Sequence, residues 1–130
     1  MGSARSRAVV LDAGALVAFE RNDKAIRRLV ELALQHGGRL HVPAGVLAQV
    51  WRDGARQARL ARLVKSGLLA IQDLDVDEAR ATRTLCGAAG TSDVVDASVA
   101  ILARRHDAAV VTSDPADLRH LDAALTLIAC

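Results

Sequence analysis

The chain has 130 residues, of which 52% are hydrophobic and 25% are charged, and its formal net charge is +2. A chain of this length fits one domain, and its apolar content excludes intrinsic disorder. The net charge is too small to argue for nucleic-acid binding, which would need a local basic patch, and the two cysteines suggest neither a disulfide framework nor a zinc site.

Strand-like and helical segments alternate along the whole chain. Short apolar runs predict buried strands, and apolar residues at helical spacing, bounded by Gly, Pro and capping residues, predict helices. In chain order we predict a strand at 8–11, helices at 15–20 and 22–36, a strand at 40–42, a helix starting at Pro43, a helix between Gly54 and Gly67, a strand at 68–71, a helix at 75–86 closed by Gly87, a helix at 93–105 capped by Thr91 or Ser92, a strand at 109–111, a helix from Pro115 to Leu121 and a strand at 125–128. This alternation is typical of a parallel, three-layer α/β domain.

Three aspartates stand where an apolar segment meets a helix start. Asp12 follows the first strand, Asp114 follows the strand at 109–111, and Asp96 lies in the first part of the helix at 93–105. Each of Asp12 and Asp114 could simply cap the helix that follows it. Because parallel strands end at a common edge, where open α/β sheets place their active sites, the three carboxylates could instead converge there.

The helix that carries Asp96 is apolar on nearly all sides, so a carboxylate on it must be protonated, paired or bound to a metal. Asp93 lies three residues earlier on the same face. An all-oxygen ligand set selects Mg²⁺ or Mn²⁺, and a divalent ion would offset the mutual repulsion of the carboxylates. The four histidines show no spacing for metal ligands and are interpreted as surface or loop residues: His36, His41, His106 and His120.

Carboxylate sites for hard metals commonly act on phosphate esters, so hydrolysis of a phosphodiester is the natural inference. Arg52, Arg56, Arg59 and Arg62 repeat at helical spacing and predict a basic stripe that could follow an RNA backbone, unless they form an ordinary solvated helix face. Since aromatic residues make up only 2% of the chain, recognition should depend on charge and RNA shape rather than on base stacking.

Three motifs then resemble those of PIN-domain ribonucleases, and in particular the VapC toxins of bacterial toxin–antitoxin pairs. They are Val10–Leu16, Ser92–Ala97 and Val111–Asp114, and they match in order and spacing nearly end to end. The resemblance implies a single domain over residues 1–130 with a five-stranded parallel sheet flanked by helices. It also implies Mg²⁺-dependent endonucleolytic cleavage of RNA, a homodimer and inhibition by a VapB-like antitoxin. The residues carried over as metal ligands are Asp12, Asp93, Asp96 and Asp114, with Thr112 or Ser113 as a supporting hydroxyl.

One position departs from the family pattern. The family usually carries a glutamate on the helix after the second strand, where this chain has Gln49, whose amide oxygen can bind a cation but adds no charge. Glu20 on the first helix could compensate. The alternative function is therefore a catalytically weak module that binds RNA or a partner protein.

Two phosphate-handling families fit less well. A haloacid-dehalogenase-like phosphatase needs a second aspartate where Gly14 stands, and a receiver domain needs an acid pair at the first strand. No run approaches the roughly 18 apolar residues of a membrane span, and the first residues lack the apolar region of a secretory signal, so we expect a cytoplasmic protein. The apolar faces of the first two helices suggest a partner helix, through Leu16, Val17, Phe19, Ile26 and Leu29.

Overall fold

The computed structural model describes residues 8–130, in which five parallel strands form one sheet in the order β3-β2-β1-β4-β5. The expectation of a missing secretory signal concerns residues outside this range. The strands are β1 (Val9–Leu11), β2 (Leu40–Pro43), β3 (Leu69–Gln72), β4 (Ala109–Thr112) and β5 (Leu127–Ala129). The predicted α/β architecture, a parallel five-stranded sheet flanked by helices, is confirmed.

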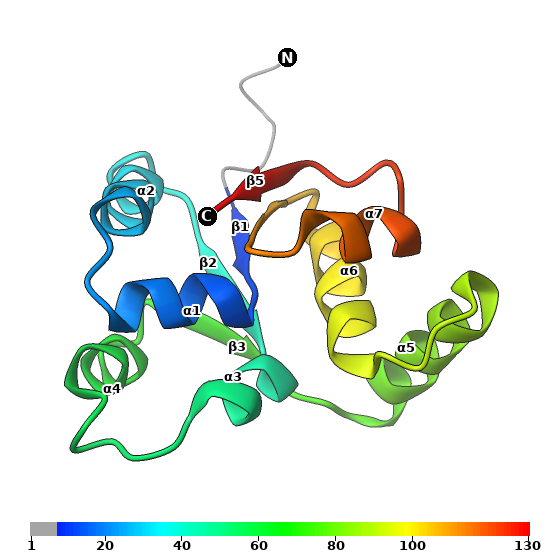
Figure 1. Cartoon of the computed structure of the whole chain (residues 1–130), viewed down its shortest axis with the longest axis horizontal. Coiled ribbons are helices and arrows are strands. Elements are labelled where there is room, and N and C mark those ends of the chain that lie inside the picture. Colours follow the sequence, from blue (N-terminus) through cyan, green and yellow to red (C-terminus); the bar gives the residue numbers. More distant parts are fainter. Residues whose placement is uncertain (1–7) are drawn as a thin grey trace.

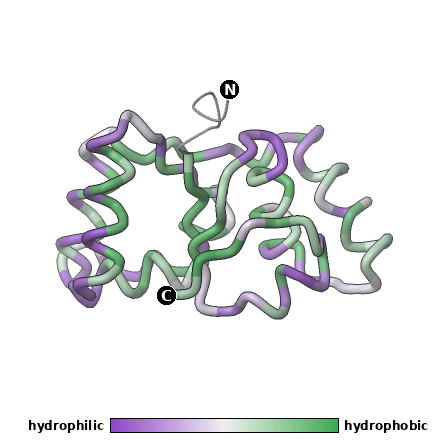
Figure 2. The backbone as a smooth tube through the Cα atoms, turned by 90° about the horizontal axis from the view of Figure 1, so that it is seen from above, coloured by the Kyte–Doolittle hydropathy of each residue, from purple (hydrophilic) through white to green (hydrophobic). Residues whose placement is uncertain are grey.

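Helices cover both faces of the sheet (Figure 1). They are α1 (Ala13–Glu20), α2 (Lys24–Gln35), α3 (Ala44–Val50), α4 (Ala58–Lys65), α5 (Val76–Ala89), α6 (Val94–His106) and α7 (Pro115–Leu121). Helices α1, α2 and α4 lie on one side of the sheet, and α5, α6 and α7 lie on the other. Helix α3 contacts α1, α6 and β2, so it lies near the end of β2. Figure 2 shows hydrophobic residues along the central part of the backbone, and hydrophilic residues on the outer helices and loops.

The core is built from the central strands and from α6. Residues 9–11 and 40–43 are buried throughout, as expected for strands covered on both faces. Helix α6 is buried from Ala97 to Ala103, which confirms the apolar-helix interpretation. The side chains proposed above as a partner surface belong to this core: Leu16 and Ile26 are buried, and Val17, Phe19 and Leu29 pack against them.

Several helix boundaries differ from the predictions, and three of the differences concern helix ends near Gly87, Asp93 and Pro43. Helix α5 continues through Gly87 and ends at Gly90, whose φ of 73° supplies the left-handed cap. Asp93, rather than Thr91 or Ser92, caps α6, because its side chain accepts a hydrogen bond from the backbone N–H of Asp96. Pro43 ends β2 instead of entering the first turn of α3.

His41 is buried on β2, contrary to its interpretation as a surface or loop residue. Its ring stacks on that of His106 at the end of α6, with centroids 4.0 Å apart and 18° between the planes. Burial, His106 and Arg39 lower the pKa of His41. This pair joins the sheet to α6.

Within residues 8–130, no single helix has the length and apolar content to cross a membrane; α5 and α6 meet that test only as a pair bent by 107°.

Candidate active site

A pocket of about 200 Å³ lies where β1 and β4 end and where α1, α3, α6 and α7 approach one another. We call it the acid pocket. Its lining residues are Asp12, Ala13, Gly14, Val46, Gln49, Asp93, Val95, Asp96, Val99, Ser113, Asp114 and Asp117. The structure thus brings together the four predicted carboxylates from three distant parts of the sequence.

Asp12 is buried at the end of β1 and also caps α1. Its Oδ1 accepts a hydrogen bond of 3.1 Å from the backbone N–H of Ala15, as the capping alternative predicted. Burial raises the pKa of Asp12, while hydrogen bonds from the Thr112 hydroxyl and from the amides of Ala15 and Gly14 oppose that rise. These bonds fix the carboxylate in place at the pocket.

Asp93 and Asp96 share the first turn of α6. The Asp93 side chain caps α6 by accepting a hydrogen bond of 3.0 Å from the backbone N–H of Asp96. The Asp96 side chain takes no part in this cap. Burial, followed by the nearby carboxyls of Asp93, Asp117 and Asp114, raises the pKa of Asp96 to about 7. The protein therefore holds Asp96 among like charges that disfavour its ionised form.

Asp114 occupies the N-cap position of α7, as the capping alternative predicted, but its side chain makes no capping hydrogen bond there. Its pKa is raised chiefly by a side-chain hydrogen bond with Asp117, followed by desolvation and by the charges of Asp117 and Asp12. Asp117 is the pocket residue that the sequence reasoning missed. The signal was its position three residues after Asp114, which places both near one face of the first turn of α7.

Thr112 and Ser113 support the pocket in different ways. Thr112 is fully buried, and its Oγ1 accepts a hydrogen bond of 2.8 Å from the Asp114 N–H. Ser113 is exposed and lines the pocket opposite Gly14. A Cβ on Gly14 would lie 2.0 Å from the Ser113 Oγ and 2.6 Å from its Cβ, so only glycine allows α1 to approach the turn after β4 this closely.

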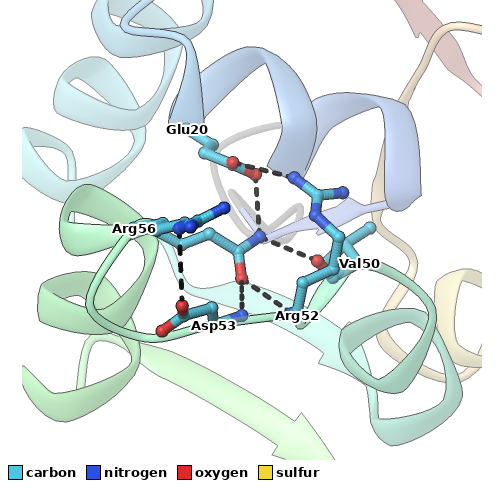
Figure 3. Close-up of polar contacts among 6 residues, drawn as sticks. Glu20, Val50, Arg52, Asp53 and Arg56 are labelled. Carbon is cyan, nitrogen blue, oxygen red and sulfur yellow. Dashed lines mark hydrogen bonds and ion pairs between the residues drawn. The ribbon is translucent and has the colours of Figure 1, made fainter.

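Gln49 lines the acid pocket from α3, as predicted for the position where the family carries glutamate. Glu20 does not compensate for it. The Glu20 carboxylate instead accepts hydrogen bonds of 3.0 Å from Arg52 and from the buried amide of Gln57 (Figure 3). Gln57 also donates to the Val50 carbonyl and accepts from the N–H groups of Arg52 and Asp53, so this network holds the α3–α4 connection against α1.

The predicted basic stripe does not form on one helix. Arg52 and Arg56 lie in the connection before α4, where they form ion pairs with Glu20 and Asp53, respectively. Only Arg59 and Arg62 lie on α4. None of these arginines is among the residues that line the acid pocket.

The donor chemistry of the acid pocket fits a hard divalent cation. Aspartate carboxylates and one amide supply oxygen ligands, and the raised pKa values of Asp96 and Asp114 show carboxyls whose charges lack a neutralising partner. Across residues 8–130, however, no three His, Cys, Asp or Glu side chains are arranged to hold an ion as they stand.

The family sequence model described as "PIN domain" matches residues 9–124, which span every strand of the sheet except β5. The chain belongs to the PIN domain family. A search of curated proteins found no match.

Solved structures share this PIN fold at low sequence identity. VapBC2 from Rickettsia felis, bound to a DNA fragment from its promoter, superposes with a TM-score of 0.70 at 18% identity, covering 95% of this chain and 98% of that one. FitAB bound to the IR36 DNA fragment gives a TM-score of 0.60 at 14% identity, with coverages of 93% and 94%. VapC20 from Mycobacterium tuberculosis, described as a toxin that cleaves the sarcin–ricin loop, gives 0.52 at 15% identity, with coverages of 77% and 84%.

Proposed function

We propose that this PIN domain is a VapC-like toxin, an endoribonuclease that depends on Mg²⁺ or Mn²⁺ and hydrolyses phosphodiester bonds in RNA. The observation that carries the proposal is the convergence of Asp12, Asp93, Asp96 and Asp114 on one pocket, with Asp117 beside them. Carboxylates crowded in this way repel one another, and a divalent cation reverses the sign of that interaction.

The side chains would have distinct tasks. Asp12, Asp96 and Asp114 are the proposed metal ligands, and Asp93 is a further one whose Oδ1 also caps α6. The amides and the Thr112 hydroxyl that hold Asp12 orient its carboxylate before any ion binds. A bound divalent ion would supply charge neutralisation at the scissile phosphate. Gln49 and Ser113 offer an amide and a hydroxyl that can orient the phosphate or a water molecule.

The biological setting is part of the same proposal. The similarity to VapBC2 and to FitAB supports a VapB-like antitoxin as partner, and the resemblance to VapC toxins supports a homodimer and a structured RNA as substrate. We also propose a cytoplasmic location, because the proposed substrate is intracellular RNA and the sequence offers no disulfide framework.

The test is cleavage of a panel of structured RNAs by wild-type protein during titration with Mn²⁺ and Mg²⁺. We expect Asp96→Asn to lower the cleavage rate by about 100-fold or more, the loss typical of removing one preorganised electrostatic group. Asp77→Asn, which changes an exposed carboxylate on α5, is the matched control and should cut at the wild-type rate. Wild-type rates for Asp96→Asn would refute the nuclease proposal.

A second candidate function is a catalytically weak module that binds RNA or a partner protein, and Gln49 is the observation that favours it. Replacing this pocket-lining amide by a carboxylate adds a charged oxygen ligand without a change of size. If wild type leaves all RNAs intact and Gln49→Glu cuts them, the binding-module function is correct for the natural sequence.

A further inference from the structure

A second, larger hollow adjoins the acid pocket. It has a volume of about 400 Å³ and is lined by Gly14, Val17, Ala18, Arg21, Asp23, Ser113 and Cys130. We call it the Arg21 trough. Gly14 and Ser113 line both the trough and the acid pocket, so the two hollows meet at the close approach of α1 to the turn after β4.

Arg21 is the single positively charged side chain among the described residues that line the two hollows. It is exposed, it follows the last residue of α1, and it makes no hydrogen bond or ion pair through its side chain within residues 8–130. The arginines considered earlier as RNA contacts differ in this respect, because Arg52 and Arg56 are paired with Glu20 and Asp53.

The other polar groups of the trough are compatible with an anion. The Asp23 carboxylate accepts a hydrogen bond of 3.0 Å from the Ile26 N–H at the start of α2, where the positive end of the helix offsets its charge. Ser113 presents an exposed hydroxyl at the junction with the acid pocket. A hydroxyl and a guanidinium group along one path can both donate to phosphate oxygens.

Distance decides which phosphate could reach Arg21. Gly14 and Arg21 lie seven positions apart along α1, which corresponds to roughly 10 Å along the helix axis. A phosphate further along the same strand would therefore lie nearer to Arg21 than a phosphate in the acid pocket would.

We propose that the Arg21 trough binds the sugar–phosphate backbone of the substrate RNA next to the scissile bond, with Arg21 contacting a flanking phosphate and Ser113 contacting the backbone at the junction. This inference rests on the proposed function for the identity of the strand as RNA. It follows from the positive charge of Arg21, which has no ion-pair partner among the described residues, and from the continuity of the trough with the acid pocket.

The experiment measures binding of a fluorescent single-stranded RNA to wild type, Arg21→Ala, Arg21→Lys and Arg83→Ala in EDTA, over a range of salt concentrations. EDTA withholds the metal, so binding is observed without cleavage. Arg83 lies exposed on α5, away from both hollows, and its removal changes the net charge equally. We expect Arg21→Ala to weaken binding and to reduce the slope of log K against log salt by about 0.7, the value for one phosphate contact on a single strand. Arg21→Lys should retain most of the slope, and Arg83→Ala should match wild type.

An unchanged affinity and slope in Arg21→Ala would overturn the proposal and assign the trough to an occupant other than nucleic acid, such as a protein segment. An equal effect of Arg83→Ala would also overturn it, since the effect would then come from net charge alone. Cleavage is measured separately with Mn²⁺. If the wild type cleaves RNA but Arg21→Ala binds RNA as well as wild type, only the proposal for the Arg21 trough is refuted. If binding depends on Arg21 but no RNA is cleaved, only the nuclease proposal is refuted.

Discussion

Among the acid-pocket carboxyls, Asp96 has a pKa raised by both burial and neighbouring charges. Burial and three neighbouring carboxyls raise its pKa to about 7, so near neutral pH the folded protein holds this carboxyl close to its titration point. The folded state binds a proton at Asp96 more tightly than the unfolded chain does. Stability from this group is therefore fully present below about pH 4 and is lost as the pH rises through about 7.

We predict that Asp96→Asn stabilises the metal-free protein at pH 8. Without solvent screening, the raised pKa would correspond to a few kcal/mol of unfolding free energy. Because Asp96 is only half buried, screening reduces the expected gain to about 1 to 2 kcal/mol. Urea unfolding in EDTA at pH 8 and at pH 4 measures it. The gain should disappear at pH 4, where wild-type Asp96 is protonated, and a gain that is equal at both pH values would contradict this account.

Single residues show which parts of the site the sequence could predict. The positions of Asp12 and Asp114 after strands, and of Asp96 near the start of a buried helix, were enough to predict that they meet at one edge of the sheet. Asp12 also showed that capping and membership of the pocket are not exclusive, because one carboxylate does both. Asp117 was missed because an aspartate in the first turn of a helix has an ordinary explanation in the helix dipole, and only the tertiary structure shows its neighbours.

At the scale of elements, the approach of α1 to the turn after β4 connects the two halves of the pocket. It depends on the missing side chain of Gly14, since a Cβ there would overlap both side-chain atoms of Ser113 and lie 3.1 Å from its backbone nitrogen. Rotation of the Ser113 side chain could move its Oγ, but not its Cβ or backbone.

Gly14→Ala is therefore expected to lower the unfolding free energy by about 1 to 3 kcal/mol, the usual cost of overpacking. Gly87→Ala is the matched control, because Gly87 lies within α5 with open space around its Cα. The control should be stabilised by about 0.5 to 1 kcal/mol through helix propensity. Thermal or urea unfolding distinguishes them, and similar changes in both variants would show that the contact with Ser113 is unimportant.

The connection between α3 and α4 depends on Gln57, whose buried amide makes four hydrogen bonds. Gln57→Ala leaves the Val50 carbonyl and part of the Glu20 carboxylate without a donor, so we expect a loss of about 2 to 4 kcal/mol in urea unfolding. Gln35→Ala, at an exposed position on α2, should change the unfolding free energy by less than about 0.5 kcal/mol. A loss for Gln57→Ala no larger than that of the control would show that water replaces the network.

Elements also show where sequence patterns mislead. The spacing of Arg52, Arg56 and Arg59 predicted one helical stripe, but helix α4 begins only at Ala58, because the preceding segment is held in a turn by Gln57. Local periodicity contains no information about this tertiary network. The sequence likewise predicts a helix stop at Gly87, but glycine ends a helix where a left-handed residue is needed, and that position is Gly90.

At the scale of the whole molecule, the His41–His106 stack joins the sheet to its most buried helix. A neutral His41 suits this environment, because burial, His106 and Arg39 all disfavour its protonated form. The pKa of His41 is lower in the folded than in the unfolded state. Its contribution to stability is therefore present above about pH 6.5 and is lost as the pH falls below that value.

We predict that His41→Phe reduces the acid sensitivity of folding between pH 7 and pH 5.5. Relative to wild type, the variant should gain up to about 1 kcal/mol of stability over this interval, since it has no imidazole to protonate. His106→Phe keeps His41 and a ring against it but removes the second charge, so its effect should be smaller. Unfolding curves for the three proteins at each pH test this, and parallel pH profiles would refute it.

The donors of the acid pocket come from four separate stretches of chain, near residues 12, 49, 93–96 and 113–117. A single nick in the connection between β3 and α5 would divide them between two fragments, with Asp12 and Gln49 on one and Asp93, Asp96, Asp114 and Asp117 on the other. Neither fragment holds the full constellation, and β2–β3 would be separated from β4–β5. If the domain hydrolyses RNA, a nicked chain should therefore be active only when both fragments associate. Partial or degraded chains should be inactive because they lack part of the set of donors.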